Sequence, residues 1–299
     1  MHYLTPYPAT PAARDRFIID LRGPRPQHDP QRYQDLAIDE EMTERGDLAR
    51  VGTVFLTGRE CPWHCAMCDL WRYTTSADTP AGAIPAQIQE ARRAWHERGE
   101  AISRIKLYNA SNFFDPRSVP DGDYDTIGAL VSGLEQVIVE SHPSLVSDRV
   151  DRFRDALAGP RLEVAMGLET VHPAALDALN KRMTTDDFAR AADELHRSDV
   201  TLRVFLLIAP PFVPADEQDE WLLKSVAFAE TCGAAVISLI PTRGGNGAME
   251  ALTAQGLFRE PSPADVERSF SLVIARRRSP QPSALCPRIL LDPWAAHAN

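Results

Sequence analysis

Short apolar runs alternate with amphipathic segments along most of the chain. From residue 51 onward, each run of β-branched and aliphatic residues precedes a polar turn and a stretch whose apolar positions recur every 3.6 residues. The runs 53–56, 105–108, 136–140, 162–168, 202–207 and 236–240 predict strands, and 87–98, the first part of 124–139, 145–157, 188–195 and 217–232 predict helices. Strands that alternate with helices at roughly thirty or more residues per unit lie parallel, with right-handed crossovers. The pattern therefore predicts an α/β fold, a partial (β/α)6 barrel of parallel strands.

The two ends of the chain depart from this repeating pattern. Residues 1–48 hold many prolines and then an acidic run at 39–41. Because proline fixes φ and removes a backbone donor, we expect little regular structure there beyond a short strand at 17–21. Residues 263 to about 277 predict a helix, and 288–291 a strand. The expected organisation is an N-terminal extension (1–48), the barrel (49–260) and a C-terminal helix and strand cap (261–299).

Three of the five cysteines lie together just after the first predicted strand, at Cys61, Cys65 and Cys68. Thiolates are soft ligands suited to an iron–sulfur cluster or to zinc, and this spacing lets one loop wrap one metal centre. A zinc site needs a fourth protein ligand, for which His64 is the candidate, although adjacent residues make an awkward ligand pair. Three unrelated buried cysteines are the third interpretation. The spacing favours a cluster with three protein ligands.

The spacing Cys-x3-Cys-x2-Cys, with the apolar Met67 before the last cysteine, resembles the cluster motif of the radical SAM superfamily. The resemblance implies a [4Fe–4S] cluster bound by Cys61, Cys65 and Cys68. It further implies that S-adenosylmethionine chelates the fourth iron and is cleaved to a 5′-deoxyadenosyl radical. The fold implied is the same partial barrel that the hydrophobic pattern predicts.

Polar residues follow the second and third predicted strands, at the edge where a parallel barrel gathers its chemistry. Asn109 and Ser111 stand where radical SAM proteins often have Gly-Gly-Glu, which binds the amino group of S-adenosylmethionine. The third strand ends at Glu140 in Glu-Ser-His-Pro, similar to Glu-Ser/Thr-Arg-Pro in the Elongator-type branch. The resemblance implies cofactor binding by all three residues. Turn formation by Asn109 and Ser111, and a solvent-facing Glu140, are the alternatives.

The fourth strand ends in Gly-Leu-Glu169-Thr, and Leu-Asn-Lys181-Arg follows before a helix. This order resembles the Elongator-type and coproporphyrinogen-oxidase-like branch. It implies that Glu169 contacts the ribose or the substrate, as a catalytic and cofactor-binding residue, and that Lys181 neutralises the methionine carboxylate. Segments 202–212 and 237–247 resemble the archaeosine synthase radical SAM subunits, so the resemblance covers 51 to about 260. The glycine-rich run 244–247 lacks the Lys-Ser/Thr of a phosphate-binding loop, and we interpret it as a loop over the barrel mouth.

Composition and charge limit the kinds of partner that the protein is expected to bind. A chain that is 44% hydrophobic and 25% charged, with no run near the ~20 apolar residues of a bilayer span, predicts a globular protein without a membrane partner. Its N-terminus has no features of a signal peptide, so a cytoplasmic location is expected. The net charge of −10 disfavours tRNA as a partner without excluding it.

The radical SAM resemblance implies a one-electron donor, a flavodoxin or a ferredoxin, and a small-molecule or modified-nucleobase substrate. The competing hypothesis is a non-catalytic barrel, stabilised by zinc or a cluster, that acts as a scaffold or binding module.

Overall fold

The computed structural model describes residues 5–277 and 286–292. Within these residues, one eight-stranded sheet has its strands in chain order. The strands are β1 (Asp35–Met42), β2 (Leu48–Phe55), β3 (Arg104–Tyr108), β4 (Gln136–Glu140), β5 (Arg161–Glu169), β6 (Thr201–Ile208), β7 (Val236–Pro241) and β8 (Arg288–Leu291). Strands β2 to β8 are parallel to their neighbours, and β1 pairs antiparallel with β2. The six predicted strands are confirmed as β2 to β7, and the predicted strand at 288–291 is confirmed as β8.

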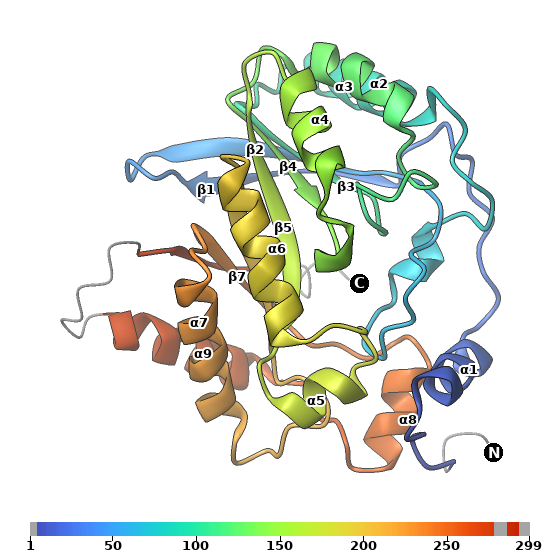
Figure 1. The fold of residues 1–299 in the computed structure, drawn as a ribbon, viewed down its shortest axis with the longest axis vertical. Helices are drawn as coiled ribbons and strands as arrows, with labels where there is room; N and C mark the ends of the chain where they lie inside the picture. The colour runs from blue at the N-terminus through green and yellow to red at the C-terminus, as the bar shows by residue number, and fades with distance from the viewer. Residues whose placement is uncertain (1–4, 278–285, 293–299) are drawn as a thin grey trace.

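Helices connect the parallel strands and pack on the outer side of the curved sheet (Figure 1). They are α1 (Pro11–Leu21), α2 (Ala83–Glu97), α3 (Tyr124–Val131), α4 (Asp148–Ala156), α5 (Pro173–Ala178), α6 (Thr185–Arg197), α7 (Gln218–Thr231), α8 (Ala248–Ala254) and α9 (Pro263–Arg277). Helices α1 and α8 lie side by side, although they are more than 200 residues apart in the sequence. No helix in the described residues is both long enough and apolar enough to span a bilayer.

The two faces of the sheet carry opposite chemistry. Outward-facing residues such as Ile105 and Leu107 of β3 are fully buried against the helices, and they belong to the main hydrophobic core. Since side chains alternate along a strand, the residue between them, Lys106, points into the barrel. Its Nζ atom lies 2.6 Å from Oε1 of Glu41 on β1. The core therefore lies between sheet and helices, and the barrel interior is polar.

Buried charges hold the polar interior together. Arg203 on β6 donates through Nε to Oε1 of Glu163 on β5 at 2.6 Å, and through Nη2 to Oε2 of Glu41 at 2.7 Å. Burial alone would raise the pKa of Glu41, but Arg203 and Lys106 outweigh it and lower that pKa to about 2. The interior ion pairs thus fix β1 against β3, β5 and β6.

Three details of the sequence prediction are wrong. The segment 17–21 is the end of helix α1, where Phe17 and Ile18 pack against α8. The segment around the acidic run 39–41 is strand β1, although we expected little regular structure before residue 48. Helix α6 extends beyond the predicted segment 188–195 at both ends, and Thr184 caps it in a capping box with Asp187.

Candidate cofactor site

The cysteine loop, residues 57–69, runs from the end of β2 and brings its three thiols into one electrostatic environment. Burial raises the pKa of Cys61, raises the pKa of Cys65 well above its ordinary value and raises the pKa of Cys68 to about 12. Cys65 also feels the thiols of Cys68 and Cys61, and Cys68 feels the thiol of Cys61. Across 5–277 and 286–292, no three His, Cys, Asp or Glu side chains converge closely enough to hold a single metal ion. The thiols of a four-iron cluster stand farther apart than the ligands of one ion. What bears on a cluster is the donor set itself, three soft thiol donors on one loop that are close enough for Cys65 to feel both other thiols.

Side chains from distant parts of the chain hold this loop. Asn246, in the loop between β7 and α8, donates through Nδ2 to the carbonyl oxygens of Ala66 at 2.8 Å and Cys68 at 3.2 Å. Asn180, which precedes Lys181, donates to the carbonyl oxygen of His64 at 2.8 Å. Asn246 is 3% exposed, so its bonds are shielded from water. The glycine-rich run 244–247 thus contacts the cysteine loop directly.

The contacts of His64 bear on the zinc alternative. Its Nδ1 atom lies 3.4 Å from Oδ1 of Asp15 on α1. That carboxylate also accepts a bond from Asn180 and, through its other oxygen, from Arg182 at 2.5 Å. His64 therefore fixes the loop to α1, and in the described residues no group suited to a single metal ion includes it.

Glu169 and Lys181 form a buried ion pair beside the thiols. Nζ of Lys181 lies 2.5 Å from Oε1 of Glu169, and the two residues are 8% and 7% exposed. Burial lowers the pKa of Lys181, but Glu169 and the Cys65 and Cys61 thiols outweigh it, so this pKa is raised. A Cβ atom at Gly167 would overlap both charged atoms, which explains the glycine in the Gly-x-Glu motif. The structure thus brings together two predicted site residues from β5 and the loop after α5.

The backbone at several strand ends is strained. Ala110 after β3, Glu169 at the end of β5 and Ala209 after β6 have φ values of 52°, 68° and 55°. The same holds for Asn180 and Arg182, which flank Lys181, at φ 61° each. Residues with side chains rarely adopt this left-handed region, and such strain collects at functional sites at a cost of about 1–3 kcal/mol each. Strain therefore marks the same edge of the barrel that the motifs indicate.

Asn109 and Ser111 leave hydrogen-bonding capacity unused at this edge. Oδ1 of Asn109 and Oγ of Ser111 are buried and have no hydrogen-bond partner among the described residues. Asn109 is fixed through its Nδ2 atom, which donates to Oγ of Ser118 at 2.9 Å. Buried polar groups without hydrogen-bond partners are uncommon in folded proteins, and they indicate a place where a ligand can bind. These two atoms fit the donor groups of an ammonium such as that of S-adenosylmethionine.

Glu140, at the end of β4, places a carboxyl group inside the barrel. Burial, together with the carboxylate of Asp292 after β8, raises the pKa of Glu140 to about 8, although Lys106 and Lys181 act in the opposite direction. The structure thus gives Glu140 an interior position, in contrast to the solvent-facing alternative. Its carboxyl group can accept bonds from hydroxyl groups of a bound molecule.

The motif analysis missed two residues that connect the loop to the strand ends, Trp63 and His142. The rings stack with centroids 3.9 Å apart and an angle of 10° between their planes. Nε2 of His142 lies 2.9 Å from the carbonyl oxygen of Lys181, and burial and Lys181 lower the pKa of His142 to about 3. The neutral ring therefore links the cysteine loop to the lysine. The position of His142, directly after the Glu-Ser end of β4, was the sequence signal that could have identified it.

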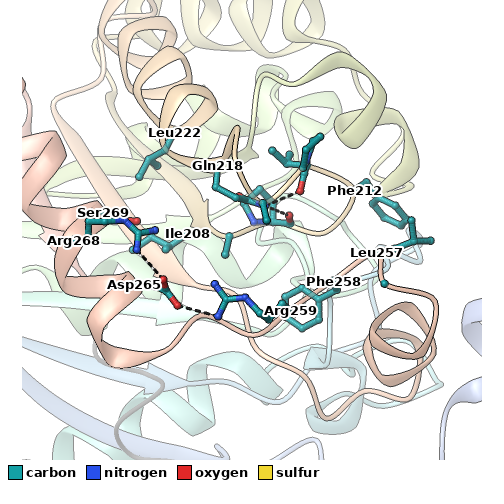
Figure 2. A pocket seen from close by; sticks show the side chains of 16 residues that line it. Ile208, Phe212, Gln218, Leu222, Leu257, Phe258, Arg259, Asp265, Arg268 and Ser269 are labelled. Atoms are coloured by element: carbon teal, nitrogen blue, oxygen red, sulfur yellow. Dashed lines mark hydrogen bonds and ion pairs between the residues drawn. The ribbon is translucent and has the colours of Figure 1, made fainter.

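A cavity of about 370 Å³ opens at the end of β6, outside this site. Figure 2 shows Asp265 between Arg259 and Arg268, with Phe258 and Leu257 on the other side. Asp265 lies 3.0 Å from Arg259 and 2.8 Å from Arg268, so its charge is compensated. None of the predicted site residues lines this cavity.

Comparison with known proteins finds relatives in sequence and in fold. No protein-family model matches the chain. Archaeosine synthase subunit beta of Methanosarcina acetivorans is 27% identical over 223 residues, 70% of this chain and 62% of that one. The protein of the same name from Thermococcus kodakarensis is 24% identical over 178 residues, 56% of this chain and 54% of that one. The chain thus spans between about half and three fifths of the length of these relatives.

Solved structures show the same fold. Elp3 of the archaeon Methanocaldococcus infernus has a TM-score of 0.52 at 14% identity, over 70% of this chain and 52% of that one. Methylornithine synthase has a TM-score of 0.50 at 13% identity, over 74% of this chain and 63% of that one. The suspected resemblance to the radical SAM superfamily is confirmed. The predicted fold, a partial radical SAM barrel, is also confirmed; the chain is similar to archaeosine synthase subunit beta in sequence and to Elp3 and methylornithine synthase in fold.

Proposed function

We propose that this protein is a radical SAM enzyme that holds a [4Fe–4S] cluster on Cys61, Cys65 and Cys68. The observation that carries the proposal is the position of Cys61 and Cys65 within reach of the electric field of Lys181, which is buried in an ion pair with Glu169. When bound, the cluster and S-adenosylmethionine supply a 5′-deoxyadenosyl radical that abstracts a hydrogen atom from the substrate. The protein's contribution is orientation and exclusion of water.

The strand-end residues have separate roles in this proposal. Lys181 binds the methionine carboxylate as a point charge, with Glu169 limiting its movement. Asn109 and Ser111 accept bonds from the amino group through their unpartnered oxygens. Glu140 and Glu169 accept bonds from ribose hydroxyls, and Glu169 also faces the substrate as a catalytic residue.

The substrate and partners follow from the relatives and from charge. We propose a modified nucleobase or a similar small molecule as substrate, because two relatives carry the name archaeosine synthase subunit beta. The net charge of −10 disfavours direct tRNA binding by this chain alone. A flavodoxin or ferredoxin supplies the electron, and the reducing cytoplasm suits an oxygen-sensitive cluster.

The test is anaerobic purification with iron and sulfide analysis and EPR of the reduced protein. We expect about four irons per chain and an EPR signal that changes when S-adenosylmethionine is added. Cys61→Ala, Cys65→Ala and Cys68→Ala should each lose the cluster, whereas Cys286→Ser, at an exposed cysteine outside the loop, should keep it. Colourless wild-type protein with one zinc per chain would refute the radical mechanism and favour the scaffold alternative.

A further inference from the structure

Asn112 joins the strand-end loop after β3 to the sulfur of Cys61. Its Nδ2 atom lies 3.1 Å from Sγ of Cys61, and its Oδ1 atom lies 2.6 Å from the backbone nitrogen of His142. A backbone N–H can only donate, so the amide oxygen must face His142. The amide nitrogen therefore faces the sulfur, and the direction of the hydrogen bond to Cys61 is fixed by the geometry.

The surroundings of Asn112 keep this donor in place. The side chain is 3% exposed, so water cannot replace it. His142, whose backbone N–H donates to Oδ1 of Asn112, is itself held by the ring of Trp63 and by the carbonyl oxygen of Lys181. In a medium of low polarity a hydrogen bond to a charged sulfur is stronger than in water.

Cys61 differs from the other thiols in the source of its donors. It receives a hydrogen bond from the backbone N–H of Trp63 and a second from the side chain of Asn112, while Cys68 receives one from the backbone N–H of Leu70. The donor from Asn112 can be removed by substitution without a change in the backbone of the cysteine loop.

We propose that Asn112 raises the reduction potential of the cluster through its hydrogen bond to Cys61. This inference rests on the proposed function. Reduction adds negative charge that is shared by the cluster and its thiolates, and an N–H donor at a ligand sulfur stabilises the reduced state more than the oxidised state. Hydrogen bonds to the sulfurs are among the factors that set these potentials. Asn112 is a positioning and tuning residue, which touches a ligand of the cluster.

The test is an EPR-monitored redox titration of the reconstituted protein without substrate. Asn112→Leu should lower the equilibrium constant for one-electron reduction about tenfold, a shift of ~59 mV to more negative potential. Asn112→Asp keeps an acceptor for the His142 N–H, loses the donor and adds a negative charge. It should shift the potential in the same direction and by more.

Asn246→Leu is the matched control, because Asn246 also holds the cysteine loop but donates to carbonyl oxygens instead of a sulfur. We expect it to lower cluster retention while the clusters that remain keep the wild-type potential. An unchanged potential in Asn112→Leu with four irons per chain would overturn the proposal. The proposal would also be overturned if neither Asn112 variant loads a cluster although both apoproteins unfold like the wild type. Asn112 would then be required for cluster assembly and not for its potential. If wild-type protein loads no cluster, the proposed function fails together with this inference.

Discussion

Glu169 combines a strained backbone with a buried charge. Its φ of 68° accompanies an irregularity in the pairing of β5 with β6 between Gly167 and Glu169. This turn out of the regular strand directs the carboxylate toward Lys181. Removing one partner of a buried ion pair typically costs about 3–5 kcal/mol, because the other charge stays buried without compensation. The strain at Glu169 is therefore maintained by a strong local interaction.

Gly167→Ala should disrupt the ion pair without removing either charge. The new methyl group would overlap Oε1 of Glu169 and Nζ of Lys181, so both side-chain ends must leave their present positions. We expect the affinity for S-adenosylmethionine to fall at least tenfold and the free energy of unfolding to drop by about 1–3 kcal/mol. Equilibrium binding and urea unfolding measure the two effects. Gly133→Ala, where the added atom meets open space, is the control, and equal effects in both variants would contradict the explanation.

Glu140 should make the stability of the apoprotein depend on pH. Its pKa rises from an ordinary 4.5 to about 8, so the folded state favours the protonated form. The contribution of Glu140 to the free energy of unfolding is then largest below pH 4.5 and falls between pH 4.5 and 8, by at most ~1.4 kcal/mol per pH unit. Glu140→Gln should remove this loss, so that the variant exceeds the wild type increasingly up to pH 8.

Urea unfolding at a series of pH values checks this expectation. Glu97→Gln, at an exposed carboxyl group on α2, should follow the wild-type curve. Parallel curves for Glu140→Gln and the wild type would show that the carboxyl group of Glu140 titrates alike in the folded and unfolded chain.

At the scale of elements, strand β1 shows how polar interior contacts conceal a strand from its sequence. Glu41 points into the barrel, where Arg203 and Lys106 neutralise it. The segment therefore lacks the apolar alternation by which β2 to β7 were recognised. The helix α1 was missed for a related reason: its β-branched and aromatic residues favour a strand locally, but Phe17 and Ile18 pack against α8, which comes from the far end of the chain.

Arg203 is the residue through which β1 is fastened to β5 and β6. Arg203→Met keeps the volume but leaves Glu41 and Glu163 buried beside each other without their shared cation. We expect a loss of about 3–5 kcal/mol in the free energy of unfolding, measured with urea. Arg93→Met removes an exposed, solvent-screened ion pair with Glu90 and should leave the free energy of unfolding nearly unchanged. A similar small loss in both variants would show that the interior network is not required for stability.

At the scale of the whole molecule, the fold was predictable because each barrel unit repeats the same local pattern. Apolar outer faces gave the strands, and the rule that chemistry gathers at the carboxyl ends of parallel strands indicated the edge that carries the site. Glu169 and Lys181 were nominated by the resemblance to the radical SAM superfamily, because the residue pattern alone would make Lys181 a solvated charge before a helix. The three cysteines of the loop could be nominated as metal ligands from their spacing in the sequence alone. Asn112, His142 and Asn246 could not be assigned from the sequence, because each acts through contacts with residues at least 30 positions away.

The hydrogen bonds that Asn246 donates to the cysteine loop have a consequence for biosynthesis. The loop leaves the ribosome early, but the side chains that fix its carbonyl groups belong to segments made much later, after β5 and after β7. Until those segments have folded, the three thiols lie on a loop without its final supports. We therefore expect metal delivery to succeed on a nearly completed chain and to fail on nascent fragments that end before residue 246. Maturation of this protein would then be ordered by the chain itself, with folding first and cluster insertion second.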